Sequence, residues 1–456
     1  MERINAWSKY DVTTEKEVFE VSKDYRKYLD SSKTERECAI ETIARAEKNG
    51  YKDLEKVSSL KPGDRVYVNT MGKAVQLYII GKQPLEKGIN IVGAHIDSPR
   101  MDIKQNPMYE DSDLAYLDTH YYGGIKKYQW VALPLAMHGV VAKKDGTVVP
   151  VVIGEDEDDP VVGISDLLIH LSASQLEKKA SVVIEGEDLD IIVGSKPLKD
   201  EEKDKVKAGV LAVLKEKYDI EEEDFLSAEI EIVPAGKSRD FGLDRSMVIG
   251  YGHDDRVCAY SEIRAMFDIK DIPEFTCCCI LADKEEIGSV GATGMQARYF
   301  ENAMAEIMDK CGDYSELKLR RALTNSRMLS CDVSAGFDPT YASAFDKKNA
   351  AFLGRGVCFN KFTGARGKSG SNDANAEYLG KLRKIMDDND VAFQTAEIGK
   401  VDQGGGGTIA YICALYGMSV VDSGVPVLSM HAPWEIISKA DLYEAIKGYR
   451  AFLINA

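Results

Sequence analysis

The stretch Asn90–Arg100 reads NIVGAHIDSPR, an apolar run followed by a histidine, one further residue and an aspartate. A continuous apolar run of this kind is typical of a strand that is buried on both faces of a mostly parallel sheet. His95 and Asp97 would then lie at the carboxyl end of that strand. The pair is either a buried polar pair that closes the strand or the first half of a metal site, and the rest of the sequence decides between the two.

The composition limits the class of protein. The chain has 456 residues, more than one hydrophobic core usually holds, which predicts two domains. Its formal net charge of −17 argues against nucleic acid or an anionic membrane as a partner. Residues 1–21 carry charges throughout, and the long uncharged run 403–421 includes four consecutive glycines, so neither resembles a secretory signal or a membrane span. We therefore expect a soluble, cytoplasmic protein.

The nine cysteines agree with a reducing compartment. Cys277, Cys278 and Cys279 are consecutive in the β-type run FTCCCILA, so alternate side chains should face opposite sides of a sheet. No CxxC pair occurs in the sequence. Buried free thiols are thus favoured over a disulfide framework or a thiolate metal site.

Residue patterning divides the chain into an α/β part and a β-rich insert. Helical and strand-like segments alternate before residue 102 and after residue 246, whereas short β-like runs separated by acidic loops fill the middle. We predict a discontinuous catalytic domain, residues 1–102 and 246–456, and an insert, residues 103–245. In the catalytic domain we expect helices over 15–49, 260–269, 292–300 and 441–453, and strands over 66–69, 75–80, 89–94, 275–282 and 328–333.

Five short stretches carry ligand-type side chains, and nearly all follow an apolar, strand-like run. Open α/β sheets form their sites at such strand ends. Two imidazoles with three or four carboxylates suit zinc or a similar first-row divalent ion, and two ions rather than one. The stretches are AHIDSPR (His95, Asp97), GHDDR (Asp254, Asp255), ADKEEIGS (Glu285, Glu286), SCDVSAG (Asp332) and SMHAPWE (His431).

The chemistry of a two-metal site explains this combination. A carboxylate such as Asp254 can bridge two ions, and paired ions can polarise a carbonyl and activate a shared water together. One glutamate must stay free of metal to take and return the proton of that water. The adjacent residues Glu285 and Glu286 can supply a base and a ligand.

The ordered set HxD, DDR, KEEIGS, CD and MH, with the block MHAPWE, resembles the M18 family of metallo-aminopeptidases (aspartyl aminopeptidase/aminopeptidase I), in particular its bacterial aminopeptidase 1 branch. The match covers essentially the whole chain. It implies a three-layer α/β/α catalytic domain of the zinc-exopeptidase type, with a mostly parallel central sheet and an inserted β-rich dimerisation domain. It also implies hydrolysis of the N-terminal residue of short peptides by metal-bound hydroxide, with a glutamate as general base.

The resemblance also implies a role for each residue. His95 and Asp332 would bind one divalent ion and Glu286 and His431 the other, with Asp254 bridging. Zinc is the first choice for both ions, and cobalt and manganese suit the same ligands. Asp97 would orient His95 through its other ring nitrogen, and Glu285 would be the general base. Because the bridging aspartate of related enzymes precedes a cis peptide bond, we expect one between Asp254 and Asp255.

Assembly and specificity follow from the resemblance less directly. The resemblance implies a tetrahedral dodecamer built from dimers. It also implies that a histidine of the insert reaches the active site of a neighbouring subunit. His170 in LLIHLSA is the candidate, and a histidine on an otherwise apolar helix face is the alternative. Where the family usually continues D-x-x-H, Asp332 is followed by Val-Ser-Ala, and Asn360 falls near the position of the basic residue that reads acidic substrates. The preferred N-terminal residue, acidic or neutral or broad, stays open.

Two other classes of function share this scaffold. A carboxypeptidase or deacylase is the main alternative, and a non-catalytic relative is the third. Such a relative would have lost a ligand or the base, yet all six expected positions are filled. We therefore favour the aminopeptidase.

Overall fold

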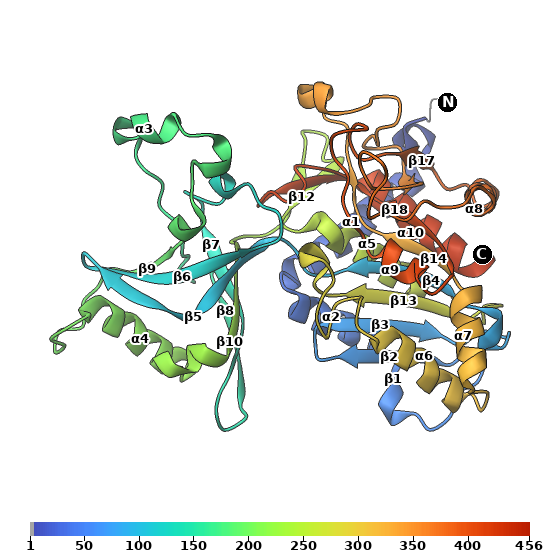
Figure 1. Cartoon of the computed structure of the whole chain (residues 1–456), viewed down its shortest axis with the longest axis horizontal. Helices are drawn as coiled ribbons and strands as arrows, with labels where there is room; N and C mark the ends of the chain where they lie inside the picture. Colours follow the sequence, from blue (N-terminus) through green and yellow to red (C-terminus); the bar gives the residue numbers. More distant parts are fainter. Residues whose placement is uncertain (1–3) are drawn as a thin grey trace. The chain divides into compact units, whose positions relative to one another are not determined.

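The computed structural model describes residues 4–456, which divide into two compact units (Figure 1). Unit 1 comprises the chain up to Asp97 together with Ser238–Met430 and Glu435–Ala456. Unit 2 comprises Ser98–Lys237 and the short segment His431–Trp434. The insert that the sequence predicts over 103–245 overlaps unit 2 as far as Lys237.

Unit 1 is built around a sheet that has nine strands within residues 4–456, in the order β1-β2-β3-β13-β4-β14-β18-β16-β17. Its central strands β13, β4, β14 and β18 run parallel to their neighbours in this group, so their carboxyl ends share one edge. The strands are β1 (Lys52–Asp53), β2 (Arg65–Thr70), β3 (Ala74–Ile79), β4 (Asn90–His95), β13 (Cys277–Ala282), β14 (Arg327–Cys331), β16 (Val357–Asn360), β17 (Phe393–Ala396) and β18 (Ser419–Gly424). Every residue of β4 is buried, as the apolar run predicts.

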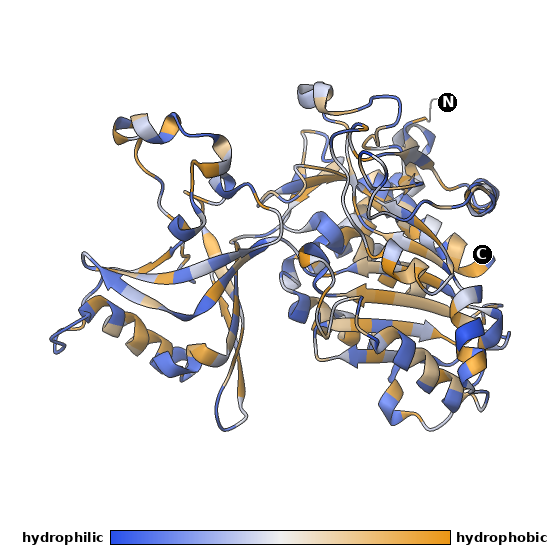
Figure 2. Cartoon of the chain, viewed as in Figure 1, coloured by the Kyte–Doolittle hydropathy of each residue, from blue (hydrophilic) through white to orange (hydrophobic). Residues whose placement is uncertain are grey.

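Helices cover both faces of this sheet, which confirms the predicted three-layer α/β/α fold. The central strands are coloured as apolar in Figure 2, as two-sided burial requires. One face packs against α1 (Val12–Ser31), α2 (Glu35–Lys48), α5 (His253–Asp268), α8 (Ala376–Asp388) and α10 (Lys439–Asn455). The other packs against α6 (Tyr299–Lys310), α7 (Glu316–Asn325) and α9 (Ala410–Ala414).

The cysteine run of β13 shows the alternation that the sequence predicts. Cys277 and Cys279 belong to the core on one face of the sheet, and Cys278 to the core on the other. All nine cysteines are free, and all but Cys311 are buried. The prediction of buried free thiols is therefore confirmed for eight of the nine.

Unit 1 also contains a second, smaller sheet. Two of its strands are neighbours, along the chain, of the elements that carry Asp254 and Asp332. Its strands, in order, are β11 (Arg239–Phe241), β12 (Met247–Gly250), β20 (Glu435–Ser438), β19 (Pro426–Leu428) and β15 (Ser334–Ala335). Strand β12 is followed by α5 after two residues, and β14 is followed by β15 after two residues. This sheet therefore anchors the chain segments before Asp254 and after Asp332.

Unit 2 is β-rich, as predicted. Its sheet within the described residues is antiparallel, in the order β8-β7-β10-β5-β6-β9. The strands are β5 (Arg100–Asp111), β6 (Leu114–Tyr122), β7 (Leu135–Ala142), β8 (Val148–Ile153), β9 (Ile191–Gly194) and β10 (Ala228–Pro234), with helices α3 (Ala173–Leu176) and α4 (Lys205–Tyr218). Across residues 4–456, none of the helices has the length and apolar character that crossing a bilayer requires.

Three predicted helices are wrong in their extent. The helix expected over 260–269 begins seven residues earlier, at His253. The helix expected over 15–49 is two helices, because Thr34 caps α2 by accepting a hydrogen bond from the Glu37 N–H while the Glu37 carboxylate accepts one from the Thr34 N–H. The helix expected over 292–300 begins only at Tyr299. Residues before it fold back on the preceding turn, since the Thr293 hydroxyl donates to Asp283 and a Cβ on Gly294 would lie 2.4 Å from the Ser289 carbonyl oxygen.

Candidate active site

His95 ends β4 with its imidazole enclosed by protein. The side chain is 2% exposed, and its Nδ1 lies 2.9 Å from the Asp97 carbonyl oxygen and 3.3 Å from Asp97 Oδ1. A carbonyl oxygen can only accept, so Nδ1 carries a proton and donates it. The Nε2 atom is therefore the one that is available to a metal ion in the neutral ring.

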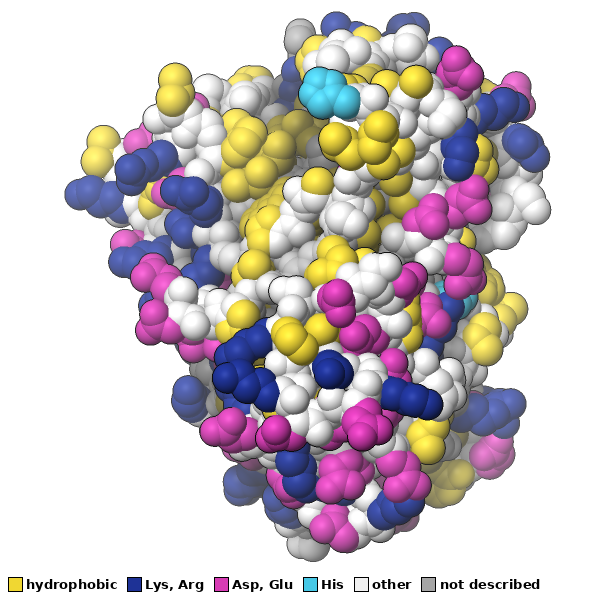
Figure 3. All heavy atoms as spheres, turned by 90° about the vertical axis from the view of Figure 1, so that its left-hand side faces the viewer, with side chains coloured by type: hydrophobic (Ala, Val, Ile, Leu, Met, Phe, Trp, Pro, Cys, Tyr) yellow, Lys and Arg dark blue, Asp and Glu magenta, His cyan; other side chains and the backbone are white. Residues whose placement is uncertain are grey.

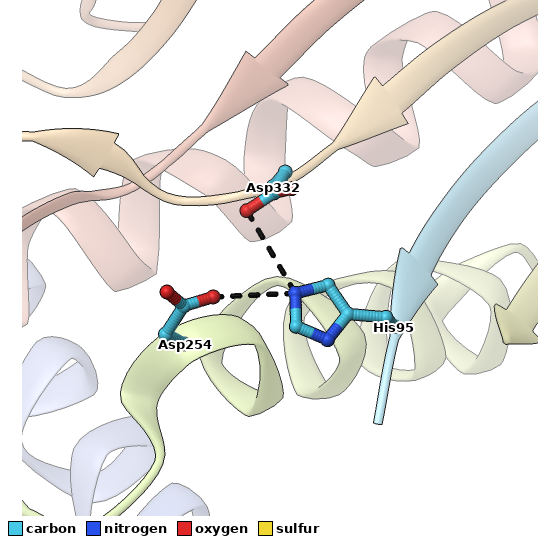
Figure 4. Close-up of side chains that lie close together, drawn as sticks. All are labelled: His95, Asp254 and Asp332. Atoms are coloured by element: carbon cyan, nitrogen blue, oxygen red, sulfur yellow. Dashed lines mark ion pairs between the residues drawn. The ribbon is translucent and has the colours of Figure 1, made fainter. Parts of the chain in front are cut away.

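Two carboxylates from other elements face Nε2 of His95 (Figure 4). Asp254 Oδ1, at the start of α5, lies 3.2 Å away, and Asp332 Oδ1, directly after β14, lies 3.8 Å away. Ligand-type atoms of these three residues lie within 4.8 Å of one another. An oxygen of Asp254 is also within 4.8 Å of a carboxylate oxygen of Glu286, so Asp254 stands between two sets of donors.

The electrostatics of the cluster favour a bound cation. Burial alone would lower the pKa of His95, but the carboxylates of Asp254, Asp332 and Asp97 outweigh it and raise that pKa well above its usual value. The pKa of the neighbouring Asp255 is also raised, by burial and then by the charge of Asp332. One imidazole cannot neutralise this many acids. A divalent cation bound by Nε2 and carboxylate oxygens would, so the donor set fits a metal of the zinc type.

The match to known families agrees with this chemistry. The model of the aminopeptidase I zinc metalloproteases (M18) matches residues 28–453. The chain belongs to the M18 family. The resemblance inferred from the motifs is thus confirmed, and the chain is a metallo-aminopeptidase, a hydrolase of peptide bonds.

M18 relatives match over the full length. A probable M18 family aminopeptidase 1 from Clostridium acetobutylicum is 62% identical over 456 residues, which span 99% of this chain and 98% of that protein. The crystal structure of the M18 aminopeptidase from Thermotoga maritima superposes with a TM-score of 0.96 at 44% identity and covers 100% of both chains. The yeast mApe1 dodecamer, at 18% identity and a TM-score of 0.77 over 95% of this chain and 96% of that one, shares the fold.

In this M18 enzyme, Asp97 links His95 to the loop that carries the two glutamates. The N–H groups of Glu285 and Glu286 donate to Asp97 Oδ1 and Oδ2, each at 3.1 Å. The loop is a single turn, Glu285–Ile287, that follows β13 after Lys284 in the left-handed region. One buried carboxylate therefore positions a histidine from one strand and a glutamate pair from the next.

Glu285 lies beside the His95 imidazole and is largely buried. Its Oε2 lies 4.0 Å from Nε2 of His95, and its side chain is 12% exposed. Burial first, and then the charge of Asp332, raise the pKa of Glu285 to about 8. Both influences favour the neutral form of this carboxyl group.

His431 belongs to unit 2 and is oriented there. Its Nδ1 donates to the carbonyl oxygen of Gly124 at 2.8 Å, which leaves Nε2 unprotonated in the neutral ring. His170 also lies in unit 2, in the 3₁₀ turn Ile169–Leu171, with its side chain exposed. The structure thus brings together six predicted residues within unit 1 (His95, Asp97, Asp254, Glu285, Glu286 and Asp332), and the roles predicted for His431 and His170 stay predictions.

Two further residues support this centre in roles that the sequence does not show. Glu435 Oε2 accepts a hydrogen bond from the Asp254 N–H at 2.9 Å, and its side chain is almost fully buried in β20. Asp255 Oδ2 faces the His95 N–H at 3.4 Å. Asp255 belongs to the motif GHDDR and Glu435 to the motif MHAPWE, each next to or near a predicted metal ligand. The expected cis peptide bond between Asp254 and Asp255 is confirmed.

Proposed function

We propose that this enzyme removes the N-terminal residue from short peptides at a centre of two divalent ions, with zinc as the first choice. The observation that carries the proposal is the position of Asp254, whose carboxylate adjoins both the His95–Asp332 pair and Glu286. His95 and Asp332 would hold one ion and Glu286 and His431 the other, with Asp254 shared. When bound, the ions supply Lewis-acid chemistry that polarises the scissile carbonyl and activates water.

The protein side chains divide the remaining work. Asp97 fixes the position of the glutamate turn, because its two carboxylate oxygens accept hydrogen bonds from the N–H groups of Glu285 and Glu286. Its carbonyl oxygen also accepts a hydrogen bond from His95 Nδ1 and so orients that ring. Glu435 holds the backbone of Asp254 in the same way. Glu285 takes a proton from the attacking water and returns it to the leaving amine, for which its position is suited, since its Oε2 lies 4.0 Å from His95 Nε2.

A neutral or broad preference for the N-terminal residue is the better supported specificity. Asn360, near the position where the family places a basic residue, is buried and donates its amide to Ser334 Oγ at 2.8 Å. The ammonium of the adjacent Lys361 lies 3.5 Å from the Asp373 carboxylate. The Asn360 side chain is therefore engaged inside the protein, and the charge of Lys361 is partly offset by Asp373.

Assembly through unit 2 is supported by its exposed apolar side chains. Those around His170 have exposed fractions of 44% at Leu167, 53% at Leu168, 69% at Ile169 and 65% at Leu171. Groups of apolar side chains are visible among the charged ones on the face drawn in Figure 3. Exposed apolar area on this scale marks an interaction site. We infer a dimer that places His170 at the neighbouring subunit. Such dimers would build a tetrahedral dodecamer, and the yeast relative is a dodecamer. We expect the enzyme in the cytoplasm, where buried thiols stay reduced.

Replacement of the proposed base tests the mechanism. Glu285→Gln should retain both metal ions and lose about 10²- to 10⁴-fold in kcat, the range that general acid–base catalysis contributes. Glu306→Gln, at an exposed position of α6, is the matched control and should leave kcat unchanged. Metal content is measured by mass spectrometry alongside the rate. Near-normal turnover of Glu285→Gln with metal bound would refute the assignment.

The form of the substrate separates this function from related hydrolases. An aminopeptidase requires a free N-terminal amine, so N-acetyl-Leu-Gly-Gly should be resistant while Leu-Gly-Gly is cleaved. Release of acetate from the acetylated peptide would instead identify a deacylase. Release of its C-terminal glycine would identify a carboxypeptidase.

A further inference from the structure

The loop that carries the two glutamates is closed at its base by one buried carboxyl group. Asp283 directly follows β13, and its side chain is 1% exposed. Its Oδ2 accepts a hydrogen bond from the Thr293 hydroxyl at 2.5 Å and lies 3.3 Å from the ammonium of Lys284. One oxygen thus contacts both the first and the last residue of the loop 284–293.

The backbone joins the same two ends of the loop. The Asp283 N–H donates to the Thr293 carbonyl oxygen at 3.3 Å, and Asp283 and Gly294 form a short parallel bridge. Thr293 is 3% exposed, so this closure lies inside the protein. Asp283 therefore binds Thr293 through both its backbone and its side chain.

The chain between these ends folds tightly around Lys284. The carbonyl oxygen of Lys284 accepts hydrogen bonds from the N–H groups of Ile287 at 3.3 Å and Ser289 at 2.7 Å. Lys284 and Ser289 both lie in the left-handed region, with φ of 66° and 60°. L-residues rarely adopt this region, and they keep it only where surrounding contacts fix it. The closure at Asp283 is such a contact, directly before Lys284 in the chain.

The two glutamates follow Lys284 at once, so their turn is attached at two separate points. The N–H groups of Glu285 and Glu286 donate to the Asp97 carboxylate, which is the first attachment. The contact between Asp283 and Thr293, which joins the ends of the loop, is the second. Since a displacement of about 1 Å can cost about 100-fold in rate, the second attachment bears on the reaction.

Asp283 does not belong to the atoms that could hold an ion. Neither of the two groups of ligand-type atoms found among residues 4–456 includes it. Its carboxyl group contacts Thr293 and Lys284 instead. Asp283 therefore acts on the reaction only through the position of the glutamate turn.

We propose that Asp283, by binding Thr293, is a positioning residue for the turn that carries the general base Glu285 and the metal ligand Glu286. The proposal rests on the roles proposed above for these two glutamates. Closure of the loop fixes the direction in which both carboxylates project from the end of β13. Loss of the closure should therefore slow the chemical step and leave the binding of substrate largely unchanged.

Removal of the Thr293 hydroxyl tests the proposal, with leucine p-nitroanilide as substrate at saturating zinc. Thr293→Val keeps the shape of the side chain and should lower kcat by about three- to tenfold, the factor that corresponds to one hydrogen bond. Its KM should stay within about twofold of the unmodified value. Thr293→Ser keeps the hydroxyl, so its kcat should lie within about twofold of that of the unmodified enzyme. Thr42→Val, at a likewise buried threonine of α2, is the matched control and should leave kcat unchanged.

A double variant assigns the effect of Thr293 to Asp283. In an Asp283→Ala background, Thr293→Val should cause no further loss of kcat, because the acceptor of the hydroxyl is already absent. A further loss equal to that in the unmodified background would mean that Thr293 acts independently of Asp283, which would overturn the proposal.

Hydrogen exchange of the metal-free protein is a readout that does not depend on activity. Amide protons over residues 284–294 should exchange about three- to tenfold faster in Thr293→Val than in the unmodified protein. The amide protons of β4 and α6 should keep their rates, because only the loop is released. Thr293→Ser should exchange like the unmodified protein.

The outcomes separate this proposal from the function on which it rests. An unchanged kcat in Thr293→Val, a fall in kcat that also occurs in Thr293→Ser, or faster exchange throughout unit 1 would each overturn the positioning role. None of these results would touch the aminopeptidase function, which Glu285→Gln tests by itself. Near-normal turnover of Glu285→Gln with metal bound would instead refute the assignment of the base, whatever the Thr293 variants show.

Discussion

Replacement of Asp97 by asparagine tests whether this buried carboxylate positions the active site. Its oxygens accept from the N–H groups of Glu285 and Glu286 at 3.1 Å each, and Oδ1 lies 3.3 Å from His95 Nδ1. Asparagine has the same shape but one acceptor oxygen. Whichever way its amide turns, one glutamate N–H loses its acceptor and faces an NH₂ group.

The size of the effect follows from that lost bond. A hydrogen bond to a charged acceptor contributes about 1.5–3 kcal/mol. Since about 1.4 kcal/mol corresponds to a factor of ten in rate, kcat/KM should fall by about 10- to 100-fold. Loss of outer partners at metal sites generally has effects of the same size, about 10- to 100-fold in affinity or activity.

The assay is kcat/KM for leucine p-nitroanilide at saturating zinc, with metal content measured in parallel. Asp309→Asn, at an exposed position of α6, is the control and should match the unmodified enzyme. Because Asp97 is not proposed to bind metal, its variant should regain full metal occupancy at higher zinc. Activity of Asp97→Asn within about twofold of the unmodified enzyme would refute the positioning role.

Three further predictions concern metal binding and stability. Asp254→Ala should lose metal and activity together, since both proposed ions share this carboxylate; metal analysis after gel filtration checks it. Asp441→Ala should lower the free energy of unfolding in urea by about 2–5 kcal/mol, because the N–H groups of Gly354 and Gly356, each 2.7 Å from that carboxylate, lose their buried acceptor. Burial raises the pKa of Asp422 to about 7, above the value of about 3.9 in the unfolded chain. Stability from this carboxyl group is therefore lost as pH rises from about 4 to about 7, and Asp422→Asn should unfold at higher urea than the unmodified protein at pH 8, with little difference near pH 4.

Each of these predictions has a result that contradicts it. Full metal content in Asp254→Ala would remove the bridging role. An unchanged urea midpoint for Asp441→Ala would mean that water or another group satisfies the two N–H donors. A difference between Asp422→Asn and the unmodified protein that is the same at pH 4 and pH 8 would show that ionisation of Asp422 does not govern the effect.

The sequence predicts the centre of the fold better than its periphery, for a physical reason. Strands such as β4 and β13 are buried on both faces, so their apolar runs are unambiguous, and motif residues mark where they end. Parallel pairing then brings those ends to one edge. The break at Thr34 was missed because a capping box can interrupt a helical pattern without changing its periodicity.

The sequence also does not predict which side chains hold the site through hydrogen bonds to backbone N–H groups. Glu435 and Asp255 support Asp254 and His95 across about 160 to 180 positions of chain, and only the folded backbone shows which N–H groups their oxygens meet. Gly294 turns the chain toward the Ser289 carbonyl instead of continuing a helix, which depends on a close approach that periodicity does not report.

The order of the donors along the chain has a consequence for how the enzyme matures. His95, Asp254 and Asp332 are separated by 159 and 78 positions, and the whole of Ser98–Lys237 intervenes between the first two. No single hairpin or helix pair can assemble them, and contacts of such long range form late in folding. Metal binding would therefore require that β4, α5 and β14 have all packed together. The free energy of metal binding would stabilise only the fully folded unit. A nascent or clipped chain that lacks β14 should carry no metal at His95, so the enzyme should acquire its activity only after Asp332 has been synthesised and β14 has docked.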